Sequence, residues 1–233
     1  MKIMTFNTQH CQNFVTGNID YEIMADAMKK CGAEIVGLNE MRDKGVSAGY
    51  GQAQVSELAK LTDMEYFYFA KAIEDGPGNP YGNGILSKHE FESVETILIP
   101  EPENKDGCKY YERRCILKAK LKNGFTVLVT HFGLSDVEQE CAVKAVLDEI
   151  TDEKCILMGD FNITPDNSLL EPIRKKMKDT AELFDVEKLS FPSDKPRIKI
   201  DYIFVTPDIE VVSADIPEII ASDHRPHTAQ INV

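Results

Sequence analysis

The sequence has no tryptophan, no excess of basic residues and no long apolar run among its 233 residues. Its 26 lysines and arginines face 39 aspartates and glutamates, so the formal net charge is -13. This balance disfavours broad adhesion to nucleic acid or anionic lipid, which normally needs a basic face, although it permits a small local basic groove. We therefore expect no strong nucleic-acid-binding surface.

A recognisable leader is also missing. Met1 and Lys2 run directly into a strand-like segment, without the basic and then apolar stretch of a secretory signal. No segment is apolar over the length that a membrane span requires. We expect a cytoplasmic protein, and a chain from which a leader had been removed would look the same.

The cysteines indicate neither a zinc site nor a redox motif, because no two of them form a C-x-x-C pair. Reduced thiols are the simplest expectation, and Cys31 and Cys155 have apolar neighbours that predict packing as small apolar groups. The six cysteines are Cys11, Cys31, Cys108, Cys115, Cys141 and Cys155.

Apolar runs, alternating patterns and turn signals predict a chain rich in strands. The expected strands are 2–8, 34–40, 65–71, 83–88, 91–99, 113–121, 125–131, 154–159, 198–206, 209–213 and 227–233. Loops are expected at 41–50 and 100–109. Apolar residues at helical spacing predict helices from Asp20 to about Cys31, from Gln52 to Leu61, from a Ser135 cap to about Ile150, and over 167–178.

This order of elements predicts helices that flank two packed sheets. The length suits one domain. Because the polar motifs described next span both ends of the chain, two domains would split them, and we expect residues 1–233 to form one domain.

Carboxylates, amides and histidines stand at the ends of the apolar runs. Buried strands that stop at such residues aim these side chains at one edge of a sheet, and oxygen-rich clusters with a few histidines suit hard metal ions and phosphate esters. The residues at the ends of the runs are Asn7, Glu40, His131, Asp160, Asn162 and Asp201, followed by Ser222-Asp223-His224.

These residues fall into six sequence blocks, which contain in order Asn7, Glu40, His131, Asp160 with Asn162, Asp201, and Ser222-Asp223-His224. The six blocks, in this order, resemble the endonuclease/exonuclease/phosphatase superfamily, which includes DNase-I-like nucleases, exonuclease III-type repair enzymes, sphingomyelinases and inositol phosphatases. The resemblance extends from Phe6-Asn7 to Ser222-Asp223-His224 and is that of a small bacterial-type member. Gly-Asp-Phe-Asn alone would be a weak signal. The family implies an α/β (α+β) fold, a four-layer α-β-β-α sandwich with the site at one end.

The resemblance implies a magnesium or manganese site. Glu40 would be its ligand, Asn7 a second oxygen ligand or a partner of the ligands, and Asp223 another carboxylate near the metal. A single carboxylate with phosphate and waters is also how Mg²⁺ is usually held. Taken alone, Asn7 would read as a turn residue and Glu40 as a solvated strand end.

The same resemblance assigns the catalytic roles. Asp160 would activate or orient the attacking water, and Asn162, on the same face of an extended segment, would bind the nucleophile or the phosphate. His224 would contact the phosphate as acid or base, with Asp201 accepting its other ring proton. His131 would contact phosphate or protonate the leaving group, whereas a lone histidine at a strand end is more often structural.

Three further residues are candidates for phosphate binding. Asn83 matches a family block whose polar residue faces the cleft, Arg114 matches a Glu-x-Arg element, and Arg42 follows Glu40 closely. Arginine suits phosphate through its planar fork, although a surface arginine explains Arg114 nearly as well. Three other histidines are read as surface or packing residues: His10, His89 and His227.

The leading hypothesis is a metal-dependent phosphoesterase that acts on a phosphodiester or a phosphomonoester through in-line attack by water. One alternative is a nuclease for single-stranded or nicked nucleic acid, which predicts a basic rim built from Arg42, Lys44, Arg113, Arg114, Arg197 and Lys199. Another is a non-catalytic binding module on the same fold. Asn39 replaces the family's usual glutamine, and the missing Trp-Arg before Asp201-Tyr202 argues against abasic-site repair.

Overall fold

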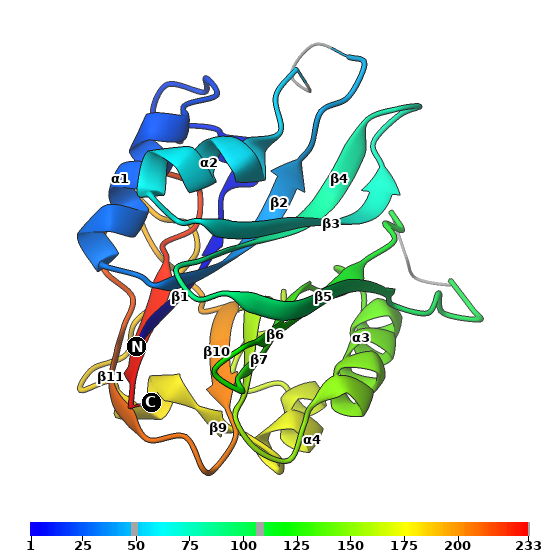
Figure 1. The fold of residues 1–233 in the computed structure, drawn as a ribbon. Coiled ribbons are helices and arrows are strands. Elements are labelled where there is room, and N and C mark those ends of the chain that lie inside the picture. Colours follow the sequence, from blue (N-terminus) through cyan, green and yellow to red (C-terminus); the bar gives the residue numbers. More distant parts are fainter. Residues whose placement is uncertain (48–50, 106–109, 233) are drawn as a thin grey trace.

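The computed structural model of the chain describes residues 1–47, 51–105 and 110–232. Two six-stranded sheets pack face to face, and helices cover the outer side of each (Figure 1). This arrangement confirms the expected four-layer α-β-β-α sandwich. An apolar core lies between the sheets, with Ile3 and Ile85 from one sheet and Val127 and Met158 from the other.

The first sheet has the strand order β11-β12-β1-β2-β4-β3. Its strands are β1 (Lys2–Asn7), β2 (Ile35–Arg42), β3 (Tyr66–Glu74), β4 (Pro80–Ser87), β11 (Val211–Asp215) and β12 (His227–Ile231). Strands β1 and β2 pair in parallel, and the other neighbours pair antiparallel.

The second sheet has the order β5-β6-β7-β8-β10-β9. Its strands are β5 (Phe91–Leu98), β6 (Cys115–Leu121), β7 (Thr126–His131), β8 (Cys155–Asp160), β9 (Lys178–Asp179) and β10 (Asp201–Val205). Here β7 and β8 form the parallel pair. Each sheet therefore has a central parallel pair whose carboxyl ends meet at one edge.

Helices α1 (Tyr21–Cys31) and α2 (Gln54–Thr62) lie on the first sheet, and α3 (Asp136–Glu149) and α4 (Glu171–Arg174) lie on the second (Figure 1). Local signals explain their limits. The carboxylate of Asp20 accepts a hydrogen bond from the backbone of Ile23 at the start of α1, and Gly32 ends it in the left-handed region. The cap expected at Ser135 is present at the start of α3, where Ser135 forms a capping box with Glu138.

One helix prediction is wrong in extent. The segment 167–178 forms a 3₁₀ turn at Ser168–Leu170, the single turn of α4, and then enters the sheet as β9. Three of its apolar residues, Leu170, Ile173 and Met177, are buried. The helix is short because Lys178 pairs with Val205 of β10, so sheet pairing overrides helix propensity there.

Several strand limits also differ from the prediction. Strand β4 begins at Pro80, three residues before the expected start at 83. Strand β10 begins only at Asp201, because 198–200 makes only an isolated bridge through Ile198. The five cysteines that the structure describes are free thiols. Cys108, part of the expected loop 100–109 and the end of the expected loop 41–50 lie outside the described residues. Within the described part of the chain, no helix has the length and apolar character needed to cross a membrane.

Candidate active site

Strand pairing brings the predicted site residues to one edge of the sandwich. Asn7 and Asn39 are partners in the parallel pair β1–β2. In the second sheet Asp160 lies between two partners, His131 on β7 and Asp201 on β10. Backbone hydrogen bonding thus assembles polar residues that are far apart in the sequence.

Two residues of the site have a positive backbone φ. Glu40 has φ +59° at a register shift in β2, and Asn162 has φ +51° just after β8. For residues with a side chain, the left-handed region costs roughly 1–2 kcal/mol. Such strain is retained mainly at functional sites, where the surrounding structure enforces it.

Gly159 explains part of the Gly-Asp-Phe-Asn block. Its φ is +150°, and a Cβ at this position would lie 1.8 Å from the carbonyl oxygen of Thr130. Only glycine lets β7 approach β8 this closely. The glycine therefore allows Asp160 and His131 to lie opposite each other at the ends of their strands.

Asn7 joins two carboxylates. Its Nδ2 donates to Oε1 of Glu40 and to Oδ2 of Asp160, both at 3.0 Å, and its Oδ1 accepts from the backbone N–H of Gln9. Asn7 is therefore a hydrogen-bond partner of Glu40, the predicted metal ligand.

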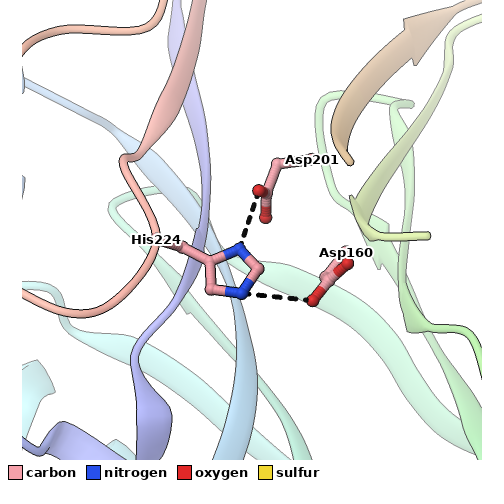
Figure 2. Close-up of side chains that lie close together, drawn as sticks. All are labelled: Asp160, Asp201 and His224. Atoms are coloured by element: carbon pink, nitrogen blue, oxygen red, sulfur yellow. Dashed lines mark hydrogen bonds and ion pairs between the residues drawn. The ribbon is translucent and has the colours of Figure 1, made fainter. Parts of the chain in front are cut away.

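Asp160, Asp201 and His224 form a compact group (Figure 2). Nδ1 of His224 lies 2.8 Å from Oδ2 of Asp201, and its Nε2 lies 3.6 Å from Oδ2 of Asp160. All three are buried. Asp201 contacts the second ring nitrogen of His224 as the sequence resemblance implies.

The charges of this group are set by competition between burial and neighbours. Burial alone would lower the pKa of His224, but the carboxylates of Asp201 and Asp160 outweigh it and raise that pKa. Burial raises the pKa of Asp160, and the Asp201 carboxylate raises it further, while His224 opposes the shift. His224 is therefore an imidazolium at neutral pH, and the carboxylates of Asp201 and Asp160 stabilise its positive charge.

His131 has its pKa shifted in the opposite direction to that of His224. Burial first, then the Arg114 cation and His224, lower the pKa of His131 well below its ordinary value. Nη1 of Arg114 donates to Nδ1 of His131 at 3.0 Å. Because a guanidinium only donates, the neutral ring carries its proton on Nε2, which lies 3.5 Å from Oδ2 of Asp160.

Asn162 lies beside both groups. Its Nδ2 donates to the carbonyl oxygen of Phe132, and its backbone N–H donates to Oδ1 of Asp160. The same Nδ2 lies 3.2 Å from Nε2 of His131, and with the ring proton on Nε2 these two donors make no hydrogen bond with each other. The strained turn after β8 thus holds Asn162 at the same edge as Asp160.

The structure places the three candidate phosphate ligands differently from one another. Arg114 contacts His131 and is paired with Glu112 at 2.6 Å. Nη2 of Arg42 lies 3.5 Å from Asp75. Asn83 is buried, with both ends of its amide engaged. Their roles in phosphate binding stay predictions.

Asp223 is partly buried and accepts a hydrogen bond from Oγ of Ser222 at 3.0 Å. Burial raises the pKa of Asp223, His224 lowers it, and Glu40 raises it again. Asp223 therefore lies within electrostatic reach of Glu40, as a second carboxylate on that side.

A sequence model of the endonuclease/exonuclease/phosphatase family matches residues 4–224. The chain belongs to this family. No curated protein matches the sequence. The family match confirms the resemblance recognised in the six blocks, and it covers every predicted site residue.

Solved structures of family members share the fold. An endonuclease/exonuclease/phosphatase from Beutenbergia cavernae matches with a TM-score of 0.84 and 22% identity, over 100% of this chain and 71% of that one. One from Bacteroides vulgatus has a TM-score of 0.78 and 22% identity, over 100% and 98%. The mannosyl-6-phosphatase Bt3783 of Bacteroides thetaiotaomicron has a TM-score of 0.77 and 15% identity, over 100% of both chains.

Two residues of this family member were missed by the sequence reasoning. Asn39, treated as a minor replacement for glutamine, accepts from the backbone N–H of Asp160 and donates to Asn83 and to the carbonyl of Thr130. It therefore ties the two sheets together beneath the site. The Asn-Glu dipeptide at the end of a buried strand is the signal that could have marked it.

His10 is the second. It was read as a surface or packing residue, but its Nδ1 lies 3.6 Å from Oε2 of Glu40. Gln9, His10 and Cys11 all have positive φ, so the chain turns left-handed there. No short sequence signal marks such a turn.

The donor set fits the divalent cation that members of this family typically use. Glu40, Asp160, Asp201 and Asp223 supply carboxylates, and Oδ1 of Asp201 is buried without a hydrogen-bond partner among the described residues. Atoms of Asp160, Asp201 and His224 also lie within 4.8 Å of one another. A protonated imidazole has no lone pair to offer on the ring nitrogen that faces the site, so the fit rests on the carboxylates.

Proposed function

We propose that this protein is a divalent-metal-dependent phosphoesterase that uses Mg²⁺ or Mn²⁺ and hydrolyses a phosphodiester or phosphomonoester by in-line attack of water. The observation that carries the proposal is that the side chains of Asn7, His131 and His224 all lie close to Oδ2 of Asp160. Asn7 lies 3.0 Å away, His131 3.5 Å and His224 3.6 Å. The family's general activity on phosphate esters supports this class of reaction.

Glu40 would hold the cation, with Asp223 as a further carboxylate. Asn7 keeps Glu40 and Asp160 in a fixed relation through its two hydrogen bonds. When bound, the cation would withdraw charge from the phosphoryl oxygens.

Asp160 would orient the attacking water and accept its proton. Its raised pKa makes it a stronger base than an exposed aspartate. Asn162, held beside it by the backbone hydrogen bond to Oδ1, would position the water or the phosphate.

The two histidines would stabilise the phosphoryl oxygens and the leaving oxygen. His224, kept protonated by Asp201, would donate a charged hydrogen bond to a phosphoryl oxygen, where negative charge develops. His131, neutral with its proton on Nε2, would donate to a phosphoryl oxygen or to the leaving oxygen. Arg114 fixes this tautomer.

The nuclease alternative has less support. It predicts a basic rim, but four of the six proposed rim cations have acidic partners: Arg42 with Asp75, Arg113 with Glu101, Arg114 with Glu112, and Lys199 with Asp179. Paired cations release fewer counterions from nucleic acid. The net charge of -13 points the same way.

The test is hydrolysis of bis(p-nitrophenyl) phosphate and p-nitrophenyl phosphate with EDTA, Mg²⁺ or Mn²⁺. Because a structural neighbour is a mannosyl-6-phosphatase, sugar monophosphates belong in the same panel. We expect metal-dependent release by wild type, its loss in Asp160→Asn, and full activity in the exposed control Asp152→Asn. No release from any ester with any metal would overturn the proposal.

A further inference from the structure

The candidate site has two halves, one on each sheet. The carboxylates near the predicted cation belong to the first sheet, because Glu40 lies in β2 and Asp223 in the segment that leads to β12. Asp160 and His131, which would serve the water and the phosphate, end strands β8 and β7 of the second sheet. Hydrolysis needs the halves at a fixed separation, since reacting groups misplaced by about 1 Å can lose about 10²-fold in rate.

Asn39 connects the two halves through the backbone of the second sheet. It precedes Glu40 in β2 and is fully buried. Its Oδ1 accepts a hydrogen bond from the backbone N–H of Asp160 at 3.0 Å, and its Nδ2 donates to the carbonyl oxygen of Thr130 at 2.9 Å. Thr130 is followed by His131. One side chain therefore holds the ends of β7 and β8 against β2.

Asn83 extends this connection toward Arg114. Its Oδ1 accepts the second hydrogen bond from Nδ2 of Asn39, at 2.9 Å, and its own Nδ2 donates to the carbonyl oxygen of Cys115 at 3.0 Å. Cys115 follows Arg114, whose guanidinium donates to His131. Asn83 lies in β4 of the first sheet. The two amides thus contact second-sheet backbone beside three residues of the site.

The chemistry of these partners calls for an amide. Asn39 accepts from one N–H with its oxygen and donates to two oxygens with its nitrogen, so its partners fix which way the group points. A carboxylate could not donate, and an apolar side chain would leave buried polar groups unpaired. Asn83 is 2% exposed with both ends of its amide engaged, which suits holding backbone better than meeting a phosphate.

Two other hydrogen bonds cross between the sheets at the site. They join Asn7 to Asp160 and His224 to Asp201. Both reach carboxylate oxygens at the end of a rotatable side chain, so they leave the backbone positions of the strand ends open. The hydrogen bonds from the two amides reach the backbone itself, which is what sets where the second-sheet side chains begin.

We propose that Asn39 and Asn83 are positioning residues that set the separation between the two halves of the site. Neither would touch the substrate. They would act through the strand ends that they hold, and so through Asp160, His131 and Arg114. The catalytic part of this proposal rests on the proposed phosphoesterase function, whereas the contacts themselves do not.

The first experiment measures the contacts without any reaction, by hydrogen exchange of the ¹⁵N-labelled whole protein. The backbone amide of Asp160 should be protected in wild type, because its acceptor is buried. Asn39→Ala should lower that protection about tenfold, which corresponds to the loss of one hydrogen bond. Equal protection of this amide in the two proteins would overturn the contact.

The matched control is Asn13→Ala. Asn13 is also buried, and it also makes three side-chain hydrogen bonds, but all of them are to residues within 15–20. This variant loses as many hydrogen bonds as Asn39→Ala, so it reports what general destabilisation does. Exchange at Asp160 and the kcat should both stay at their wild-type values in Asn13→Ala.

The second experiment separates the two halves of the site. Calorimetry with Mn²⁺ should give the same Kd for wild type, Asn39→Ala and Asn83→Ala, because Glu40 stays on its own sheet. The kcat for bis(p-nitrophenyl) phosphate should fall about 10²-fold in Asn39→Ala. It should fall less, about tenfold, in Asn83→Ala, which keeps both hydrogen bonds from Asn39 to the second sheet.

A wild-type kcat in Asn39→Ala, or a loss of kcat matched by an equal loss of Mn²⁺ affinity, would overturn the positioning role. If Asn39→Ala does not fold, Asn83→Ala carries the same comparison of kcat with Mn²⁺ affinity. Absence of hydrolysis by wild type with every metal would overturn the phosphoesterase and the catalytic part of this proposal together. The exchange experiment decides the contacts separately.

Discussion

Nδ1 of His224 lies 2.8 Å from Oδ2 of Asp201, across the junction of the two sheets. Asp201 begins β10 of the second sheet, and His224 precedes β12 of the first. Burial alone would lower the pKa of this histidine, so its positive charge depends on a carboxylate from the opposite sheet. The packing of the sheets therefore sets the charge at the site.

Replacing that carboxylate should change both rate and pH dependence. Asp201→Asn should lower kcat by about 10²–10⁴-fold, the usual contribution of a positioned acid or base. Without Asp201 the pKa of His224 falls, so the loss of activity with rising pH should begin at a lower pH than in wild type. A pH–rate profile measures this shift.

The pair should also behave as a unit. We expect His224→Ala to lower turnover by several orders of magnitude and the double variant to be no worse than His224→Ala alone. Additive losses in the double variant, or a near-wild-type rate in His224→Ala, would reject the role given to this pair.

Glu40→Ala should abolish metal-dependent turnover and leave the fold intact. The physical reason is loss of the predicted ligand, at a side chain that is 21% exposed and whose removal creates no apolar cavity. Titration calorimetry with Mn²⁺ and circular dichroism measure metal binding and folding. Glu153→Ala, at an exposed position, is the matched control. Retained activity in Glu40→Ala would remove this residue from the mechanism.

Gly159→Ala should destabilise the protein severely, by about 3 kcal/mol or more, because the added Cβ would meet the Thr130 carbonyl at 1.8 Å in a backbone conformation that alanine rarely adopts. Gly51→Ala makes the same chemical change where no atom lies within 4 Å and should be nearly neutral. Urea unfolding of both variants compares the two positions. Equal midpoints would contradict the close approach of β7 and β8.

His227 should make the protein less stable in acid. Burial, reinforced by the Lys199 charge, lowers the pKa of His227 from 6.5 to about 3 in the folded protein. Below pH 6.5 this histidine is protonated in the unfolded chain and stays neutral in the folded chain. The free energy of unfolding should therefore fall as the pH drops toward 3, and this residue contributes up to about 1.4 kcal/mol per pH unit to that fall.

The comparison for this effect is His227→Gln, which does not titrate in that range. Its free energy of unfolding should depend less steeply on pH over the same window, whatever its stability at neutral pH. Identical slopes in denaturant titrations of the two proteins would show that His227 does not cause the acid sensitivity.

Much of the fold was predictable because its signals are local. Apolar runs that end in Asn7, Glu40, His131 and Asp160 mark strands whose ends meet at one edge, and parallel pairing then gathers them. The error at 167–178 had the opposite cause. Lys178 joins the sheet through Val205, and no local pattern reports a partner 27 positions away.

The sequence by itself determined the family, the two-sheet sandwich and the residues that meet at its end, because strand patterns and six ordered blocks are encoded residue by residue. Only the tertiary structure decided which histidine is charged, that Arg114 fixes the tautomer of His131, and that His10 lies against Glu40. The charge state of a histidine depends on its burial and on its charged neighbours. Both are set by the packing of the two sheets, which brings together residues that are far apart in the sequence.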